Sequence, residues 1–365
     1  MPQIFLDRYR LEQQIFQILS QQKTERLMLI TGNYFDTLPI SHGILMAADK
    51  LNIEIIQFKD YSPNPRYEEI LSGVQAFMEH GCQGIIAVGG GSCIDTGKCI
   101  KVFSEKNRKV SDCFLMAVPT TAGTGSESTQ FAVLYKQGEK YSVDDPGILP
   151  EYVLLDGRNL KSLSDARKKA TVSDALSHGI ESFWSLKASD NSKKIAGEAI
   201  RSILTYMDAY WANDPIACEK ILEASNLAGQ AINMTRTTAA HAMCYKFTSL
   251  FGLPHGHAVM LCLPEVWQYL LEHLDDCRDR RGVRYLSDTL KDLSQCLGRE
   301  TPQEAVRFLK DLRKQLGLFC PQGITEGQLE LMTDSVNIQR LDNFPIGLKR
   351  EQLRKLYEQI VRGEK

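Results

Sequence analysis

The chain has 365 residues, with 43 basic and 45 acidic side chains and a formal net charge of −2. This near-neutral balance gives no reason to expect nucleic-acid or membrane partners, and no apolar run reaches the ~18 residues of a bilayer-spanning helix. A hydrophobic content of 43% and a charged content of 24% are typical of a globular protein, and the length favours about two domains.

The ten cysteines are scattered, and none of them forms a C-x-x-C pair. The N-terminal residues also lack the basic segment and apolar run of a secretory signal. We therefore expect reduced cysteines and a cytoplasmic protein.

Short apolar runs alternate with helical patterns in the first part of the chain. Runs bounded by glycine or proline predict buried strands, and the patterns between them predict helices. The expected strands are 27–30, 53–58, 84–88, 114–118 and 153–155, the expected helices are 11–21, 40–50, 66–79 and 92–103, and a β-hairpin is expected from 131–135 and 140–143. This alternation predicts a parallel sheet that binds ligands beyond the carboxyl ends of its strands.

Two glycine-rich turns follow these strands. The first, Gly89 to Lys98, reads G-G-G-S-x-x-D-x-G-K. Glycines between a strand and a helix let the backbone approach a pyrophosphate, and the helix N-terminus attracts it, although a simple tight turn is the alternative. The second, Pro119 to Glu127, reads P-T-T-A-G-T-G-S-E. Its hydroxyls could bond ribose or phosphate oxygens, although an ordinary polar loop is equally consistent with this composition.

From Ser164 onward the pattern is helical. Helices are expected at 165–186, 192–211, 215–234, 238–250, 257–274, 282–297, 302–316, 326–334 and 349–362. The chain thus divides into an α/β half, residues 1–158, and an all-helical half, residues 159–365. We expect the active site in the cleft between these halves.

One carboxylate and three imidazoles of the second half could gather at one point. Asp174 and His178 are four residues apart, so they share one face of a helix. His241 and His255 lie 14 residues apart, with a glycine and a proline breaking the chain just before His255. Such a set suits a divalent transition metal such as Fe²⁺ or Zn²⁺. Taken alone, an Asp/His pair at this spacing is more often a capped or solvated helix face.

Together these motifs resemble the iron-containing alcohol dehydrogenase family over nearly the whole chain. The residues that carry the resemblance are Gly89–Ser92 with Asp95 and Lys98, then Pro119–Glu127, Asp174–Glu181, His241 and Pro254–Gly256. The resemblance implies a Rossmann-like N-terminal domain and an all-helical C-terminal domain, the architecture of dehydroquinate synthase. It also implies reversible hydride transfer between NADPH or NADH and a small aldehyde or ketone, and a homodimer.

The resemblance also implies the site residues. The metal ligands are expected to be Asp174, His178, His241 and His255. The residues expected to contact the nucleotide are Gly32, Asn33, Gly89, Gly90, Gly91, Ser92, Asp95, Lys98, Thr120, Thr121, Thr124 and Ser126. Glu181, three residues after His178, is expected to orient that histidine or to face solvent.

Two positions depart from the family pattern. Many members carry a second histidine four residues after the position of His241, but here this residue is Tyr245, followed by Lys246. The proton donor could therefore be the phenol or water. The turn after the first long strand contains Gly32 and Asn33 instead of the acidic residue that often selects NAD, which favours NADPH.

The stretch 241–249 looks most like the phosphonoacetaldehyde reductase branch, whose product is 2-hydroxyethylphosphonate. Tyr245 and Lys246 are then expected to contact the phosphonate, although a solvated helix lysine is the plainer alternative for Lys246. Three further alternatives stay open: a dehydrogenase of another small alcohol, polyol or aldehyde, a dehydroquinate-synthase-like lyase, and a non-catalytic metal-binding protein.

Overall fold

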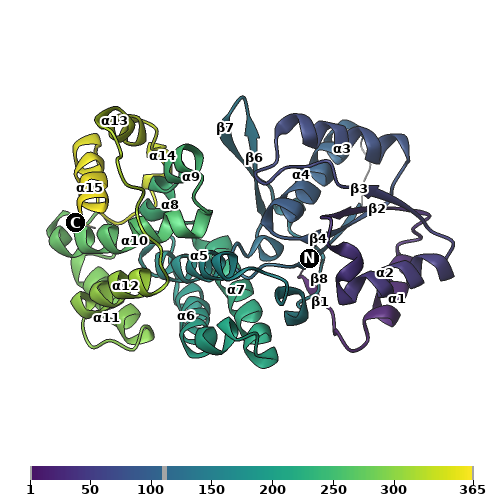
Figure 1. Ribbon diagram of the computed structural model, residues 1–365, viewed down its shortest axis with the longest axis horizontal. Coiled ribbons are helices and arrows are strands. Elements are labelled where there is room, and N and C mark those ends of the chain that lie inside the picture. The colour runs from purple at the N-terminus through teal and green to yellow at the C-terminus, as the bar shows by residue number, and fades with distance from the viewer. Residues whose placement is uncertain (1, 109–112, 364–365) are drawn as a thin grey trace. The chain divides into compact units, whose positions relative to one another are not determined.

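Residues 1–163 and 213–226 form an α/β unit (unit 1) built on one six-stranded sheet. In order across the sheet, the strands are β1 (Ile4–Phe5), β8 (Tyr152–Val153), β5 (Phe114–Pro119), β4 (Gly84–Gly89), β2 (Arg26–Thr31) and β3 (Glu54–Phe58). All neighbouring pairs are parallel, as predicted. The computed structural model describes residues 2–108 and 113–363, and Figure 1 shows their helices and strands.

Four helices of unit 1 pack on the sheet, two on each face. These are α1 (Leu11–Gln21) and α2 (Pro39–Lys50) on one face, and α3 (Tyr67–Glu79) and α4 (Gly91–Arg108) on the other. The expected hairpin is also present, as β6 (Phe131–Lys136) and β7 (Glu139–Asp144).

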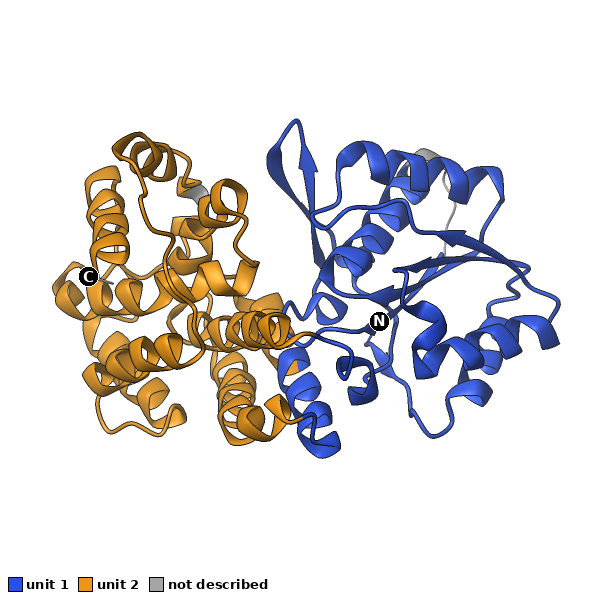
Figure 2. Ribbon diagram, viewed as in Figure 1, with its two compact units in different colours: residues 1–163, 213–226 blue, residues 164–212, 227–365 orange. Residues whose placement is uncertain are grey.

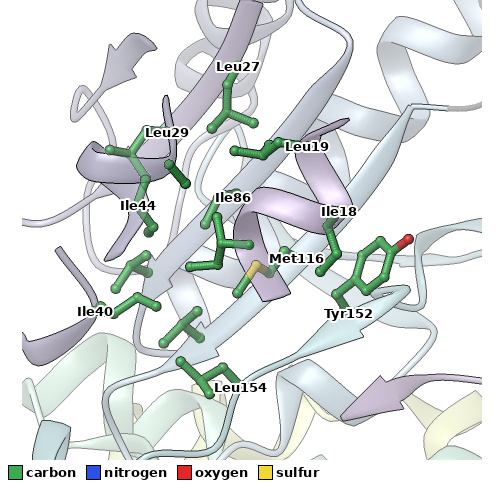
Figure 3. Packing of buried hydrophobic residues seen from close by; sticks show 14 of the residues in the cluster. Ile18, Leu19, Leu27, Leu29, Ile40, Ile44, Ile86, Met116, Tyr152 and Leu154 are labelled. Carbon is green, nitrogen blue, oxygen red and sulfur yellow. The ribbon is translucent and has the colours of Figure 1, made fainter. Parts of the chain in front are cut away.

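The strands of the sheet are apolar on both sides because both of their faces are covered. Leu27 and Leu29 of β2 pack with α1 and α2, and Figure 3 shows Leu29 beside Ile44 of α2. Met28 and Ile30, which point to the opposite face, pack with α3 and α4. Each such buried side chain contributes roughly 1.5–3 kcal/mol to folding. Because both faces of the sheet are buried, the apolar residues of these strands form continuous runs instead of alternating with polar ones.

The strands that precede the glycine-rich turns end at one edge of the sheet. Thr31 at the end of β2 is in register with Val88, and Gly89 at the end of β4 is in register with Pro119. The chain runs from β2 to β3 on one side and then returns to β4 on the other side of β2. The carboxyl ends of β2 and β4 therefore form a topological switch point, which is where ligands bind in open α/β sheets.

Residues 164–212 and 227–365 form a helical unit (unit 2), and Figure 2 colours the two units separately. Its helices are α5 (Asp165–Trp184), α6 (Asp190–Trp211), α8 (Ala239–Met243), α9 (Tyr245–Phe251), α10 (His255–Glu272), α11 (Val283–Cys296), α12 (Pro302–Gln315), α13 (Glu326–Asp334), α14 (Ile338–Leu341) and α15 (Arg350–Arg362). The chain passes between the units three times, after Leu163, after Ala212 and after Asn226, and the last of these boundaries falls within α7 (Pro215–Thr235). The predicted fold class, an α/β part followed by a mostly helical part, is confirmed. Within the described ranges, no helix is long and apolar enough to cross a membrane.

Two helix predictions near the site were wrong in detail. The single helix expected over 238–250 is divided at Cys244 into α8 and α9. The thiol of Cys244 donates to the carbonyl of His241 at 3.3 Å, the acceptor that the backbone N–H of Tyr245 would use in an unbroken helix. The helix expected from residue 257 begins at His255, directly after Pro254. His255 is therefore the first helical residue of α10.

Candidate functional site

Helix α5 presents Asp174 and His178 one turn apart, as their spacing predicts. Ser164 caps this helix by accepting a hydrogen bond from the backbone N–H of Arg167 at 3.4 Å. Both Asp174 and His178 are buried, and Nε2 of His178 lies 3.9 Å from Oδ1 of Asp174. The sequence thus places a carboxylate and an imidazole inside unit 2, where each needs a polar partner.

Two further histidines approach the same carboxylate oxygen. Nε2 of His241, on α8, lies 3.5 Å from Oδ1 of Asp174. Its ring is stacked on that of His178, with centroids 4.6 Å apart and an angle of 14° between the planes. Nε2 of His255, at the start of α10, lies 3.8 Å from the same oxygen. All three histidines therefore face one oxygen of Asp174, and His178 is the farthest of them at 3.9 Å.

Gly256 explains how His255 reaches α5. A Cβ atom at this position would lie 2.0 Å from the carbonyl oxygen of Ala170 and 2.8 Å from the backbone nitrogen of Asp174. Only glycine therefore allows the first turn of α10 to lie against the backbone of α5. This close approach sets His255 beside Asp174.

The cluster fits a divalent metal ion. Oδ1 of Asp174 and Nε2 of His241 are buried, and neither has a hydrogen-bond partner in the part of the chain that the structure describes. Asp174, His241 and His255 each offer one ligand atom, and these atoms all lie within 4.8 Å of one another. Buried lone pairs without a donor cost free energy, and a cation among them would give them a common partner.

One side of the cluster is open. The side chains of Asp174, His178 and His241 are at most 7% exposed, whereas that of His255 is 35% exposed. A small molecule therefore has access to the cluster beside His255.

The carboxylates give the cluster a preference for positive charge. Burial acts to raise the pKa of Asp174, but the three histidines outweigh it and lower this pKa. Burial acts to lower the pKa of His241, but Glu181 and Asp174 together raise it to about 9. Nε2 of His241 therefore attracts either a proton or a metal ion.

Glu181 is a functional residue whose partner the sequence did not reveal. It is fully buried, and its Oε2 accepts a hydrogen bond from Nδ1 of His241. Its Oε1 accepts from Thr238 Oγ1 at 2.5 Å and from the backbone N–H of Ala240 at 2.9 Å. The expectation that Glu181 orients His178 or faces solvent was therefore wrong. The sequence showed only that Glu181 lies on the same helix as Asp174 and His178. It did not show the contact with His241, which is 60 residues away.

Tyr245 and Lys246, the two residues expected to act on substrate, lie at the start of α9. The ring of Tyr245 is stacked on that of His255, with centroids 5.9 Å apart and an angle of 14°. The hydroxyl of Tyr245 accepts a hydrogen bond from Nη1 of Arg340, a residue that the sequence did not single out. Lys246 is half-buried and forms no ion pair with any described residue.

In unit 1, the first glycine-rich turn is shaped by its close neighbours. A Cβ atom on Gly89 would lie 2.4 Å from the Cβ of Cys93. On Gly91 it would lie 2.8 Å from the side chain of Thr124, and on Gly90 it would lie 3.3 Å from that of Thr121. The two predicted loops therefore pack against each other, and glycine keeps this contact possible.

The partly exposed residues of these loops are available to a ligand. They are Gly90, Gly91, Ser92, Asp95, Thr120, Thr121 and Thr124. Helix α4 begins at Gly91, so its first N–H groups point from the same turn. Hydroxyls and free N–H groups at a helix N-terminus are suited to phosphate oxygens.

Lys98 does not line the surface of these loops. It is fully buried, and its Nζ donates to Ser126 Oγ at 3.1 Å, Thr129 Oγ1 at 3.0 Å and the carbonyl of Phe131 at 2.9 Å. Burial lowers the pKa of Lys98 to about 8, although Asp95 and Glu127 act in the opposite direction. Direct contact between Lys98 and a nucleotide is therefore not the arrangement of this structure.

Asp95 and Ser126 belong to the same internal network. Oδ1 of Asp95 accepts from Ser126 Oγ at 2.5 Å, and Oδ2 accepts from the backbone N–H of Val133 at 2.9 Å. These bonds tie α4 to the second loop and to β6. Lys98 and Ser126 therefore support the loops from inside, whereas Asp95 is half-buried and its expected contact with the nucleotide stays a prediction.

Gly32 and Asn33 follow β2 at the same edge of the sheet. A Cβ atom on Gly32 would meet nothing within 4 Å, and Asn33 is exposed. This turn therefore has room for an additional group.

These features are those of a metal-dependent oxidoreductase that uses a nucleotide cofactor, and comparison with known sequences identifies the family. The pattern described as "Iron-containing alcohol dehydrogenase" matches residues 2–157, and that of "Fe-containing alcohol dehydrogenase family, C-terminal" matches residues 168–361. The chain belongs to the iron-containing alcohol dehydrogenase family. The predicted enzyme class, an NAD(P)-dependent oxidoreductase of alcohols and aldehydes that uses iron, is thereby confirmed.

Individual relatives differ in their substrates. The chain is 24% identical to the NADPH-dependent butanol dehydrogenase of Clostridium saccharobutylicum, over 94% of each chain. It is 28% identical to the phosphonoacetaldehyde reductase of Streptomyces viridochromogenes, over 74% of each. An iron-containing alcohol dehydrogenase of Thermococcus thioreducens has a similar fold, with a TM-score of 0.87 at 24% identity, over 100% of this chain and 98% of the other.

Proposed function

We propose that this chain reduces a small aldehyde to a primary alcohol at one metal ion held by Asp174, His178, His241 and His255. The observation that carries this proposal is the approach of three imidazole Nε2 atoms to within 3.5 to 3.9 Å of one carboxylate oxygen. Three imidazoles and one carboxylate accept Fe²⁺ or Zn²⁺, and the family favours Fe²⁺.

The bound groups and the protein divide the chemistry between them. The metal supplies a Lewis acid for the aldehyde oxygen, and the nicotinamide supplies the hydride. Glu181 holds the ring of His241 in one orientation, and the exposed side of His255 admits the aldehyde. The hydroxyl of Tyr245 is the candidate to donate a proton to the product oxygen, with water as the alternative.

NADPH is the nucleotide that we propose for unit 1. Gly90, Gly91 and Ser92 would bind the pyrophosphate at the N-terminus of α4, and the hydroxyls of the second loop would bind nearby oxygens. The turn at Gly32 and Asn33 has space and carries no carboxylate, so a 2′-phosphate meets no repulsion there. NADH remains the alternative.

Phosphonoacetaldehyde is the substrate that we propose. A phosphonate carries negative charge, and Lys246 offers a half-buried ammonium group without an ion pair among the described residues. The similarity to a phosphonoacetaldehyde reductase over 74% of the chain supports this choice. The product would be 2-hydroxyethylphosphonate, an intermediate suited to phosphonate biosynthesis.

A neutral aldehyde is the second candidate, because the butanol dehydrogenase relative matches a larger share of the chain. Steady-state kinetics of the metal-loaded enzyme separate the two. We would compare phosphonoacetaldehyde with propionaldehyde, each with NADPH and with NADH. The proposal expects a higher kcat/KM for the phosphonate, whereas an equal or higher value for propionaldehyde would reject it and keep the general reductase.

A further inference from the structure

We propose that Thr238 is a positioning residue of the metal site, and that its hydroxyl holds Glu181 in the orientation that leaves Nε2 of His241 to the metal ion. This inference rests on the proposed function, since it concerns the same metal cluster. Thr238 does not belong to the expected ligand set, and the sequence suggested only that a helix begins there.

The hydroxyl of Thr238 lies between a donor and a carboxylate. Nε1 of Trp184 donates to Oγ1 of Thr238 at 2.9 Å, and this hydroxyl donates to Oε1 of Glu181 at 2.5 Å. An indole N–H can only donate, so the oxygen of Thr238 must accept from it, and the single hydroxyl proton is directed to Glu181. The other oxygen of Glu181 accepts from Nδ1 of His241. The four side chains therefore form one chain of hydrogen bonds in which the direction of each bond is fixed.

This chain of hydrogen bonds is closed to water and anchored at its far end. The side chains of Trp184, Thr238 and Glu181 belong to residues that are at most 1% exposed. The indole of Trp184 packs edge-to-face against the rings of Trp267 and Phe344, with centroids 5.3 and 6.3 Å apart. Because water does not reach these groups, a partner that is removed is not replaced by solvent. The orientation of the carboxylate therefore depends on the hydroxyl of Thr238.

Capping of α8 is the ordinary role of a threonine at this position, but the hydrogen bonds assign that role to another residue. Thr238 directly precedes α8, where a hydroxyl normally accepts from one of the first backbone N–H groups of the helix. Here the N–H of Ala240 donates to Oε1 of Glu181 instead, at 2.9 Å. Glu181 therefore caps the helix that carries His241, and the hydroxyl of Thr238 orients this cap.

A purely structural role for Thr238, as the acceptor for the buried N–H of Trp184, makes a different prediction. Loss of that acceptor would lower the free energy of unfolding but leave the metal affinity of the folded protein unchanged. Loss of a positioning contact would lower the metal affinity, and would do so only while the carboxylate of Glu181 is present to be positioned. The dependence of the Thr238 effect on Glu181 thus separates these roles.

The experiment measures the Zn²⁺ affinity of the full-length protein by competition with a chromophoric chelator, together with urea unfolding of the metal-free protein. Thr238→Val keeps the shape of the side chain and removes the hydroxyl, Thr238→Ser keeps the hydroxyl, and Thr238→Ala removes it if valine prevents folding. The hydroxyl-free variant is also combined with Glu181→Gln. Thr333→Val is the matched control, because Thr333 is 3% exposed and its hydroxyl donates to the carbonyl of Leu329 at 2.8 Å in α13.

Thr238→Val should bind Zn²⁺ roughly three- to tenfold more weakly than the unaltered protein, a smaller loss than that expected for Glu181, which contacts the ligand residue itself. Thr238→Ser and Thr333→Val should bind Zn²⁺ nearly as tightly as the unaltered protein. In the Glu181→Gln background, removal of the hydroxyl should change the affinity by less than about twofold.

Three results would overturn the positioning role. They are an unchanged affinity in Thr238→Val, an equal loss in Thr238→Ser or Thr333→Val, and a loss in the double variant that equals the product of the two single losses. If the unaltered protein binds Zn²⁺ tightly, any of these results rejects only the role of Thr238. If the unaltered protein does not bind Zn²⁺ tightly, the proposed metal site is rejected, and the role of Thr238 with it.

Discussion

Nδ1 of His241 donates a hydrogen bond to Oε2 of Glu181, and this bond determines what the other ring nitrogen can do. A carboxylate only accepts hydrogen bonds, so the proton of the neutral ring must reside on Nδ1. Nε2, which faces Asp174 at 3.5 Å, is then left with a lone pair for a metal ion. The partner of Glu181 thus fixes both the orientation and the tautomer of His241.

Glu181→Gln should weaken metal binding without unfolding unit 2. One glutamine oxygen cannot accept from His241, Thr238 and Ala240 together, so the imidazole loses its fixed tautomer. The expected loss of metal affinity is roughly 10- to 100-fold, measured by competition with a chromophoric chelator. Glu265→Gln is the control. Glu265 lies on α10, forms an ion pair with Lys310 of α12 at 3.0 Å, and has no assigned role in the cluster. Equal affinities in both variants would remove Glu181 from the metal site.

Gly256→Ala should both destabilise the protein and displace His255. The added Cβ would lie 2.0 Å from the carbonyl oxygen of Ala170, a backbone atom that cannot rotate away. We expect the free energy of unfolding to fall by about 1–3 kcal/mol, and the metal affinity to fall with it. Gly327→Ala is a matched control in α13, where a Cβ would meet nothing within 4 Å, and it should be neutral or stabilising by up to ~1 kcal/mol. A Gly256→Ala protein as stable as the control would show that the two helices can separate freely.

Lys98 should make the stability of the protein rise with pH in the alkaline range. Its pKa falls from 10.5 to about 8 on folding because burial disfavours the ammonium form. Between these values the unfolded chain binds more protons than the folded chain, so the free energy of unfolding increases with pH, by about 3 kcal/mol in total. Below the folded pKa both states are protonated, and the contribution no longer changes.

Urea unfolding from about pH 7 to about pH 10.5 measures this effect as a difference from Lys98→Met. Other titrating groups are common to both proteins and cancel in the difference. The unaltered protein should gain stability relative to Lys98→Met as the pH rises above about 8, and Lys355→Met, at an exposed position, should follow the unaltered protein. Parallel pH profiles for the unaltered protein and Lys98→Met would mean that Lys98 titrates normally.

Gly32→Asp should change the choice of nucleotide. The new side chain has room, since nothing lies within 4 Å of its Cβ, and its charge would repel a 2′-phosphate while it accepts from a ribose hydroxyl. The ratio of kcat/KM for NADPH to that for NADH should fall by roughly tenfold or more, equivalent to one repulsive charge contact. Gly32→Asn has nearly the same size without the charge, so it should shift the ratio far less. The same shift in both variants would assign the effect to size.

Much of unit 1 could be predicted because its signals are local. Continuous apolar runs bounded by glycine or proline specify buried strands, and the helical patterns between them specify the parallel connections. Strand β1 was not predicted, because two residues, Ile4 and Phe5, are too few to show a pattern. Its pairing with β8 is what makes it a strand. The glycine-rich turn could be located from the sequence because it directly follows a strand, but its packing against Thr121 and Thr124 of the second loop could not.

The site was predictable only where its residues share an element or a family motif. Asp174 and His178 follow from helical spacing, whereas the chain break before His255 only made the approach of His241 and His255 possible, and the resemblance made it specific. Glu181 and His241 are 60 residues apart, and no local sequence pattern shows that their helices lie side by side. For Lys98, the same positive charge suits a phosphate or an internal hydroxyl, so its burial in the network with Asp95 could be learned only from the structure.

The central claim is that Asp174 and the three histidines hold the metal on which turnover depends, and an anaerobic Fe²⁺ titration tests it most directly. Metal-free protein would receive Fe²⁺ in steps, with bound metal and NADPH oxidation by phosphonoacetaldehyde and by propionaldehyde followed together. The account predicts that activity rises in proportion to bound metal and stops rising at one ion per chain, and that Asp174→Asn loses both tight binding and turnover. Full turnover by metal-free protein, or tight stoichiometric binding and turnover in Asp174→Asn, would contradict it.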